Sequence, residues 1–300
     1  MKPTPKRFSF NAMGSFCEIQ LCEESQSRAK KTVGLLTDEV ARLESKYSRF
    51  RKDSFLSEIN LAAGRSRGIE IDNETESLLE HALNCFNISD GLFDISAGAL
   101  TEIWDFKNEV VPSQEQIDNA LAQVGLDRLS WGNSRLRLPP GMQIDFGGIV
   151  KEYAADSVAR LACSLGVRHG LVNLGGDFSV IGPLADDLSW SVAIASPDPQ
   201  LGIMAKVGLR DGGLASSGDY ERCFIHEGTR YSHILNPKSG WPCAGLRAVS
   251  VAANLCTVAG SVATIAMLKD EAHAKAWLEE SRLPHVFMDS KELIGGSGLA

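Results

Sequence analysis

Apolar side chains recur every three or four residues along residues 27–50, where one face of a helical projection carries Val33, Leu36, Val40, Leu43 and Tyr47. This spacing predicts a long amphipathic helix. The same reasoning predicts helices over 73–86, 113–125, 151–166, about 256–269 and 270–281. The helix predicted over 113–125 opens with Ser113 and Gln116, which have the spacing of a capping box, and it stops at a glycine.

From residue 171 onward the pattern changes to short apolar runs separated by Gly, Asp, Pro and Asn. Such runs are typical of antiparallel strands joined by tight turns. The predicted strand regions are 171–182, 190–196, 203–210, 222–235, 246–253 and 284–289, with a turn at 226–230. Helices followed by strands and then by helices indicate an α+β fold rather than a regular βαβ alternation.

Composition and charge narrow the function classes. The formal net charge of the 300 residues is −8, so broad binding to nucleic acid or to an anionic membrane is not expected. The seven cysteines are scattered without CxxC spacing, which argues against zinc and against a disulfide framework. The N-terminal residues lack the apolar segment of a signal peptide, and no transmembrane span or membrane anchor is predicted. We therefore expect a cytoplasmic protein.

Two glycine pairs stand beside acidic residues. In "IDFGGIVKEYAAD" (144–156) a strand-like run ends at Asp145, Gly147 and Gly148 follow, and Lys151 opens a predicted helix; "LVNLGGD" (171–177) repeats the Gly-Gly-acid order. Glycines let a ligand approach the backbone and expose N–H groups to an anion. Strand-end glycines can equally serve only as turns. Neither pair has Rossmann or Walker spacing, so a nucleotide would bind in another way.

Two other stretches carry candidate chemistry. "GLFDISAG" (91–98) offers Phe93 and Asp94 between glycines, which could form a shelf for a planar ring. His233 comes near the end of a predicted strand, just before an Asn-Pro-Lys-Ser-Gly turn. A lone histidine is more often structural than catalytic, but its place before a loop favours a functional role.

These stretches together resemble the ApbE family of FAD:protein FMN transferases. The resemblance rests on an ordered set of blocks between Met13 and about Thr264: "MGS", "YSRFRKDSFLSEIN", "GLFDISAG", "LTEIWDF", "IDFGGIVKEYAAD", "LVNLGGD", "SSGDYER" and "YSHILNPKSG". It implies one α+β domain over 1–300, related to the tunnel fold, with two lobes that divide near residue 140. It also implies a reaction in which FAD is cleaved with Mg²⁺ or another divalent cation, FMN moves to a Ser or Thr hydroxyl of a target protein, and AMP leaves.

The resemblance also implies roles for individual residues. Those carried over as FAD-binding are Met13, Tyr47, Leu92, Phe93, Asp94, Asp145, Lys151 and Ile234, with Leu92, Phe93 and Asp94 in the loop that holds the adenosine. Lys151 would counter the pyrophosphate charge. The carbonyl of Gly148 and the side chain of Thr264 match metal ligands, and His233 matches the base that activates the target hydroxyl.

The chain departs from the family pattern at two positions that concern the metal site. The family usually has Lys-Gly where this chain has Lys151 and Glu152, and Ala-Asp-Ala-x-x-Thr where it has "AGSVAT", so Gly260 replaces a metal-binding aspartate. Glu152 would weaken anion binding if it points inward and would be harmless if it faces solvent. Besides an active transferase, this leaves a flavin-binding protein with weak or absent activity, and an FAD pyrophosphatase, as alternatives.

Overall fold

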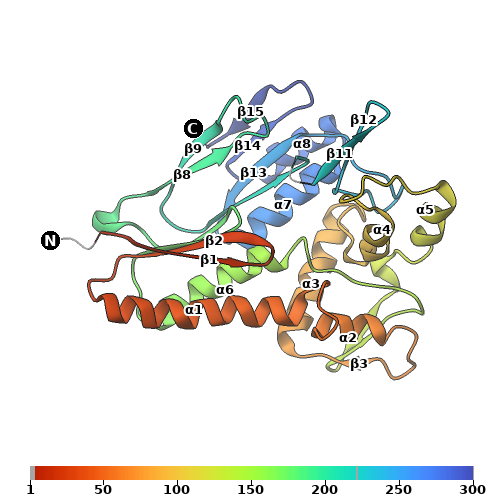
Figure 1. The fold of residues 1–300 in the computed structure, drawn as a ribbon, viewed down its shortest axis with the longest axis horizontal. Coiled ribbons are helices and arrows are strands. Elements are labelled where there is room, and N and C mark those ends of the chain that lie inside the picture. Colours follow the sequence, from red (N-terminus) through yellow and green to blue (C-terminus); the bar gives the residue numbers. More distant parts are fainter. Residues whose placement is uncertain (1–3, 221, 300) are drawn as a thin grey trace.

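The computed structural model describes residues 4–220 and 222–299, and its main feature is an eight-stranded sheet (Figure 1). The strands lie in the order β1-β2-β6-β7-β10-β13-β14-β15, and every neighbouring pair is antiparallel. Their bounds are Lys6–Ala12 (β1), Ser15–Leu21 (β2), Gly170–Leu174 (β6), Asp177–Gly182 (β7), Gly213–Gly218 (β10), Ala248–Ala253 (β13), His285–Met288 (β14) and Ile294–Ser297 (β15).

Three smaller sheets and eight α-helices complete the described chain. The smaller sheets are formed by Ile69–Glu70 (β3), Arg135–Arg137 (β5) and Ser130–Gly132 (β4), by Trp190–Ala195 (β8) and Ile203–Leu209 (β9), and by Cys223–His226 (β11) and Thr229–Ser232 (β12). The helices are Gln26–Tyr47 (α1), Phe55–Leu61 (α2), Asn73–Ile88 (α3), Gly98–Ile103 (α4), Gln114–Leu121 (α5), Val150–Ser164 (α6), Cys256–Leu268 (α7) and Glu271–Ser281 (α8).

Alternation along the strands sends side chains into two different cores, one on each face of the large sheet. Val172 and Ala215 join the main core, which α1, α6 and α7 cover. Their neighbours Leu171 and Leu214 point the other way and pack with the β8–β9 hairpin around Trp190. The sheet is therefore buried on both faces, with helices on one side and a hairpin on the other (Figure 1).

A buried carboxylate fixes α7 against α6. Asp156 of α6 is 3% exposed and accepts hydrogen bonds from the backbone N–H groups of Cys256 and Thr257, at 2.9 Å each, and from the Thr257 hydroxyl at 2.7 Å. It caps the N-terminus of α7, whose own N-cap residue, Leu255, provides no side-chain cap. Because this contact sets the register of the two helices, it also decides which residues meet one turn further along.

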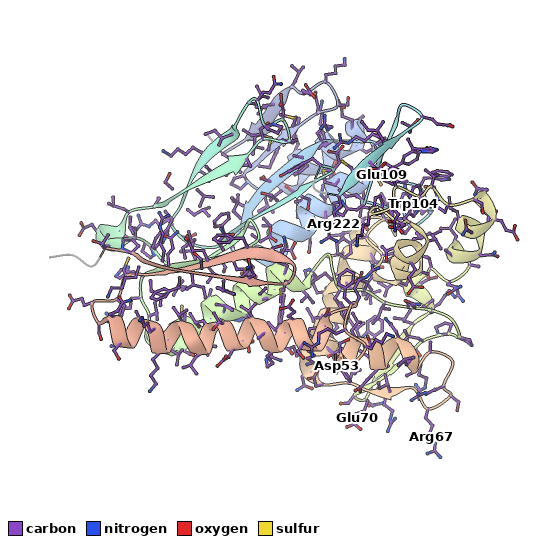
Figure 2. The ribbon with its side chains drawn as sticks, in the orientation of Figure 1. Asp53, Arg67, Glu70, Trp104, Glu109 and Arg222 are labelled. Carbon is purple, nitrogen blue, oxygen red and sulfur yellow. The ribbon has the colours of Figure 1, made fainter. Side chains whose placement is uncertain are left out.

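A third core joins residues 97–124 to the β11–β12 hairpin. Trp104 is 3% exposed, packs against Tyr231 with ring centroids 5.5 Å apart, and donates a hydrogen bond to the carbonyl of Gly240 at 2.9 Å. Figure 2 shows Trp104 and Arg222 in this region, well away from Asp53 and Glu70 at the outer edge formed by α2 and β3. The segment that follows β12 packs on this core, and His233 is its first residue.

The structure confirms the α+β class and most predicted elements. The predicted turn region 226–230 contains the β11–β12 turn, whose two residues, Glu227 and Gly228, have left-handed φ. The predicted strand that ends at Asp145 is wrong: this segment is a loop, in which the Asp145 N–H donates to the Ile95 carbonyl at 2.7 Å. The β1–β2 hairpin, α2 and α4 were not among the predicted elements.

Two further expectations concern the whole chain. None of the helices among residues 4–220 and 222–299 has both the length and the apolar character needed to cross a membrane. All seven cysteines are free thiols, as their scattered spacing predicted.

Candidate functional site

The site is built around the N-terminus of α6 and two tight turns of the large sheet. Gly175 and Gly176 connect β6 to β7 and adopt φ values of 63° and 92°, which only glycine adopts readily. A side chain at Gly175 would come within 2.7 Å of Ser15, so this turn lies against the β1–β2 turn that holds Met13. Gly147 and Gly148 have no left-handed φ, so the two glycine pairs differ in conformation.

Lys151 extends from the first turn of α6 to this hairpin. Its Nζ lies 2.8 Å from Oδ2 of Asp177 and 3.4 Å from the Gly175 carbonyl oxygen. The Asp177 side chain is 1% exposed, and its Oδ1 accepts a hydrogen bond from the Ser216 N–H at 3.2 Å. Lys151 is 28% exposed, so its charge is available to a ligand while its position is fixed by a buried partner. Asp177 was not among the predicted site residues.

The loop before α6 is held by a second ion pair. Asp145 accepts from the Gly147 N–H at 2.8 Å and binds Arg49 through its Oδ2 at 3.0 Å. Arg49, which was also not predicted, donates to Thr101 as well. The ring of Phe93 lies 3.5 Å from the position that a Cβ at Gly148 would take, so Phe93 and Gly148 form one wall of the site.

Met13 and Tyr47 are each held by a hydrogen bond to a neighbouring helix. Met13 has φ 52° in the β1–β2 turn, and its N–H donates to Glu44 at 2.8 Å. Tyr47 is 4% exposed: its hydroxyl lies 2.9 Å from the Thr75 hydroxyl, and its ring meets Phe146 edge to face at 5.5 Å. Burial raises the pKa of Tyr47 to about 12. The tyrosine therefore packs beneath the Asp145–Gly148 loop.

Asp94 lines a cleft of about 420 Å³. The cleft is lined by Phe86, Asn87, Asp90, Gly91, Asp94, Val124, Gly125, Pro237 and Lys238. Asp94 accepts from the Ser96 N–H and hydroxyl at 2.7 and 2.6 Å and from the Leu126 N–H at 3.1 Å, and burial raises its pKa. The Asp94 carboxylate thus holds the chain that follows it against the start of the segment at Leu126. Leu92 is half-buried and packs against the main core.

His233 opens the segment that leads from β12 to the Pro237–Lys238 side of the cleft. Its backbone N–H donates to the Arg222 carbonyl at 3.0 Å, and its Nδ1 lies 3.2 Å from the same oxygen. Since a carbonyl only accepts, Nδ1 carries the proton in this contact, and Nε2 of the neutral ring is left as an acceptor. The next residue, Ile234, is half-buried against the main core.

The predicted metal region contains a pair of hydroxyls and a buried carboxylate. The Thr264 hydroxyl lies 3.1 Å from that of Ser217 on β10. Ser261 points away from this pair, and its hydroxyl oxygen lies 2.8 Å from Nε2 of His81. Within residues 4–220 and 222–299 no cluster of three or more His, Cys, Asp or Glu side chains is arranged to hold a metal ion. A cation here would need hydroxyl, carbonyl and phosphate oxygens in addition.

Glu152 points inward, which settles the open question about this residue. It is 6% exposed, and burial together with the charge of Asp177 raises its pKa to about 8. A Cβ built at Gly260 would lie 2.6 Å from Cγ and 2.7 Å from Oε1 of Glu152. The glycine on α7 therefore leaves the space that the glutamate from α6 fills.

This contact gives a prediction about stability. Replacing a helical glycine by alanine normally stabilises a helix by about 0.8–1.0 kcal/mol, but Gly260→Ala is expected to destabilise the protein by about 1–3 kcal/mol because of the collision with Glu152. In a Glu152→Ala background the same change should be stabilising. Gly34→Ala is the control, since nothing lies within 4 Å of a Cβ at that position of α1. Equilibrium urea unfolding measures the free energy of unfolding for Gly260→Ala in each background and for Gly34→Ala. If Gly260→Ala destabilised wild type and the Glu152→Ala variant equally, the collision with Glu152 would not be its cause.

Comparisons with known proteins identify the family of this chain. Residues 13–287 match the model of the ApbE family. A protein from Vibrio cholerae named FAD:protein FMN transferase is 28% identical over 280 residues, covering 91% of this chain and 84% of that protein. One of the same name from Treponema pallidum is 30% identical, covering 84% and 75%.

Solved structures show the same fold. The ApbE protein of Thermotoga maritima superimposes with a TM-score of 0.89 at 28% identity, covering 98% of this chain and 97% of that one. The flavinyl transferase ApbE of Pseudomonas stutzeri, in its apo form, gives a TM-score of 0.88 at 28% identity, covering 99% and 95%. With the family match over nearly its whole length, this chain belongs to the ApbE family.

Proposed function

We propose that this protein is an FAD:protein FMN transferase that uses FAD and a divalent cation to attach FMN to a Ser or Thr hydroxyl of a target protein. The observation that carries the proposal is the family match over residues 13–287, together with relatives that bear this name along most of the chain. The free thiols of all seven cysteines support a reducing, cytoplasmic location.

The reaction forms a bond from the target hydroxyl oxygen to the FMN phosphorus and breaks the bond from that phosphorus to the oxygen bridging to AMP. AMP leaves with the bridging oxygen, and the hydroxyl proton goes to a base. His233 suits that role because its Nδ1 donates to Arg222, which leaves Nε2 to accept a proton. Lys151 supplies positive charge near the pyrophosphate, and the Gly175–Gly176 turn lets the phosphates approach the backbone.

The residues in the predicted metal region fit a hard cation. The Thr264 and Ser217 hydroxyls lie together, the Gly148 carbonyl belongs to the loop that leads into α6, and a carboxylate oxygen of Glu152 is buried without a hydrogen-bond partner among the described residues. When bound, such a cation neutralises phosphate charge and stabilises the departing AMP. Thr264 and Gly148 would hold it together with the phosphates.

The test is a transfer assay. The purified protein is incubated with FAD, Mg²⁺ and a flavin-accepting target domain, and the target is analysed by intact mass and in-gel flavin fluorescence. We expect one FMN per target and an equal amount of AMP, and no labelling of a target whose acceptor hydroxyl is replaced by Ala. AMP and FMN released without labelling would show an FAD pyrophosphatase, and FAD binding with no product would show a flavin-binding protein.

A prediction on ligand choice follows from the cleft beside Asp94. FAD should bind more tightly than FMN, because only FAD has an adenosine that can occupy the cleft. Asn87→Trp fills the cleft from the exposed C-terminal end of α3 and should weaken FAD binding about tenfold, roughly 1.4 kcal/mol, without changing FMN affinity. Asn84→Trp, one turn earlier on the exposed face of α3, is the matched control. The affinities are measured by fluorescence titration. If Asn87→Trp lost equal affinity for FAD and for FMN, the adenosine would not bind in this cleft.

A further inference from the structure

The two departures from the family pattern, Glu152 and Gly260, are one coupled feature of the fold. Asp156 of α6 binds the backbone N–H groups at the start of α7, which sets the two helices in antiparallel register. One turn back along α6 is Glu152, and one turn forward along α7 is Gly260. The position of a Cβ at Gly260 lies 2.6–2.9 Å from Cγ, Oε1 and Cδ of Glu152. The glutamate carboxylate thus occupies the place where a side chain from position 260 would stand.

Glu152 has the character of a ligand rather than of a structural acid. Asp156, one turn away, is also buried, but it accepts four hydrogen bonds, from Ser179, Cys256 and twice from Thr257. Glu152 is 6% exposed, and its Oε2 is fully buried with no hydrogen-bond partner among the described residues. Burying a carboxylate oxygen without a donor is costly, and a cation removes that cost.

The surroundings of Glu152 supply other oxygen donors. Thr264 lies one turn beyond Gly260 on the same helix, and its hydroxyl is 3.1 Å from the Ser217 hydroxyl of β10. Lys151, the preceding residue, extends to Asp177 and the Gly175 turn, where the phosphates of FAD are proposed to lie. A cation at this place would touch a carboxylate, a hydroxyl and phosphate oxygens, which are the donors that Mg²⁺ and Mn²⁺ prefer.

We propose that Glu152 provides the carboxylate ligand of the divalent cation, in place of the aspartate that the family pattern has at position 260. The proposal rests on the proposed function, since the cation serves the cleavage of FAD. A glutamate from α6 is one methylene longer than an aspartate from α7, and the glycine at 260 gives it room to enter from the neighbouring helix. The two changes from the family pattern then compensate each other: position 260 loses its aspartate, position 152 gains a glutamate, and the metal site is kept.

The test measures binding of Mn²⁺ by electron paramagnetic resonance, with saturating FAD and no target protein. Glu152→Gln removes one charge and keeps the shape of the side chain; it should weaken Mn²⁺ binding about tenfold or more. Glu39→Gln, which removes a half-buried carboxylate of α1 that contacts Ser157 on the outer side of α6, should bind Mn²⁺ like wild type. The reciprocal exchange Glu152→Gly with Gly260→Asp should bind Mn²⁺ more tightly than Glu152→Gln does.

A second readout separates a ligand from a merely structural acid. Without metal, Glu152→Gln should melt at about the same temperature as wild type, because the amide keeps the shape of the buried side chain, and Mn²⁺ with FAD should raise its melting temperature less than that of wild type. If Glu152→Gln binds Mn²⁺ as tightly as wild type, the proposal is overturned. So does a wild-type protein that binds FAD and transfers FMN but shows no Mn²⁺ binding. If wild type binds Mn²⁺ through Glu152 but transfers no FMN, the ligand assignment holds and the proposed function fails.

Discussion

His233→Ala is expected to lower the rate of FMN transfer about 10²–10⁴-fold while leaving the affinity for FAD unchanged, as for removal of a general base. The reason lies in the contact with the Arg222 carbonyl, 3.2 Å from Nδ1, which fixes the proton on that nitrogen and leaves Nε2 to accept one from the target hydroxyl. Single-turnover kinetics of target labelling measures the rate, and flavin fluorescence measures binding.

The hairpin that precedes His233 offers a matched control. His226 is an exposed histidine on β11, and His226→Ala should transfer FMN at the wild-type rate. Transfer by His233→Ala at the wild-type rate would show that this histidine is not the base. A lower melting temperature with proportionally weaker FAD binding would instead mark His233 as a structural residue of the β12 segment.

The helices and the central strands of the fold could be predicted from the sequence because their signals are local. The α1 face of Val33, Leu36, Val40 and Leu43 is buried as its spacing predicts, and α7 covers almost the range expected. The β1–β2 hairpin also carries a local signal, the alternation of Cys17, Ile19 and Leu21 toward the core, although it was not among the predicted strands. The strand predicted to end at Asp145 is wrong because a buried apolar run can form its backbone hydrogen bonds without pairing in a sheet.

The candidate site was predictable only in part, for a physical reason. Lys151, Asp145 and the glycine pairs stand out by residue type, and the family resemblance pointed to Thr264, but their partners are distant in the sequence. Lys151 meets Asp177 and Thr264 meets Ser217 only in the folded chain, and Asp145 meets Arg49 through the loop before α6. Whether Glu152 faces inward depends on the register of α6 against α7, which Asp156 sets through tertiary hydrogen bonds. No local pattern in the sequence contains that information.

Lys151→Ala is expected to have two separate effects, on ligand affinity and on stability. Losing one charge-assisted contact to a phosphate is worth about 1.5–3 kcal/mol, so the FAD dissociation constant should rise roughly 10–100-fold. A lysine at a helix start is not a core residue, and from the sequence alone its replacement is expected to leave the fold unaffected. The structure alters that expectation: Lys151 pairs at 2.8 Å with Asp177, which is 1% exposed, so we also expect a loss of about 3 kcal/mol in the free energy of unfolding.

A second substitution separates the two effects. Asp177→Asn removes the buried charge but keeps an oxygen that can accept from the Ser216 N–H, so Lys151→Ala with Asp177→Asn should recover most of the stability. It should not recover FAD affinity, because the positive charge is still absent. Urea unfolding and FAD titration of wild type, both single variants and the double variant measure the two quantities independently. If FAD affinity returned together with stability, Lys151 would act only by holding Asp177 and the hairpin turn in place, and it would not be a phosphate ligand.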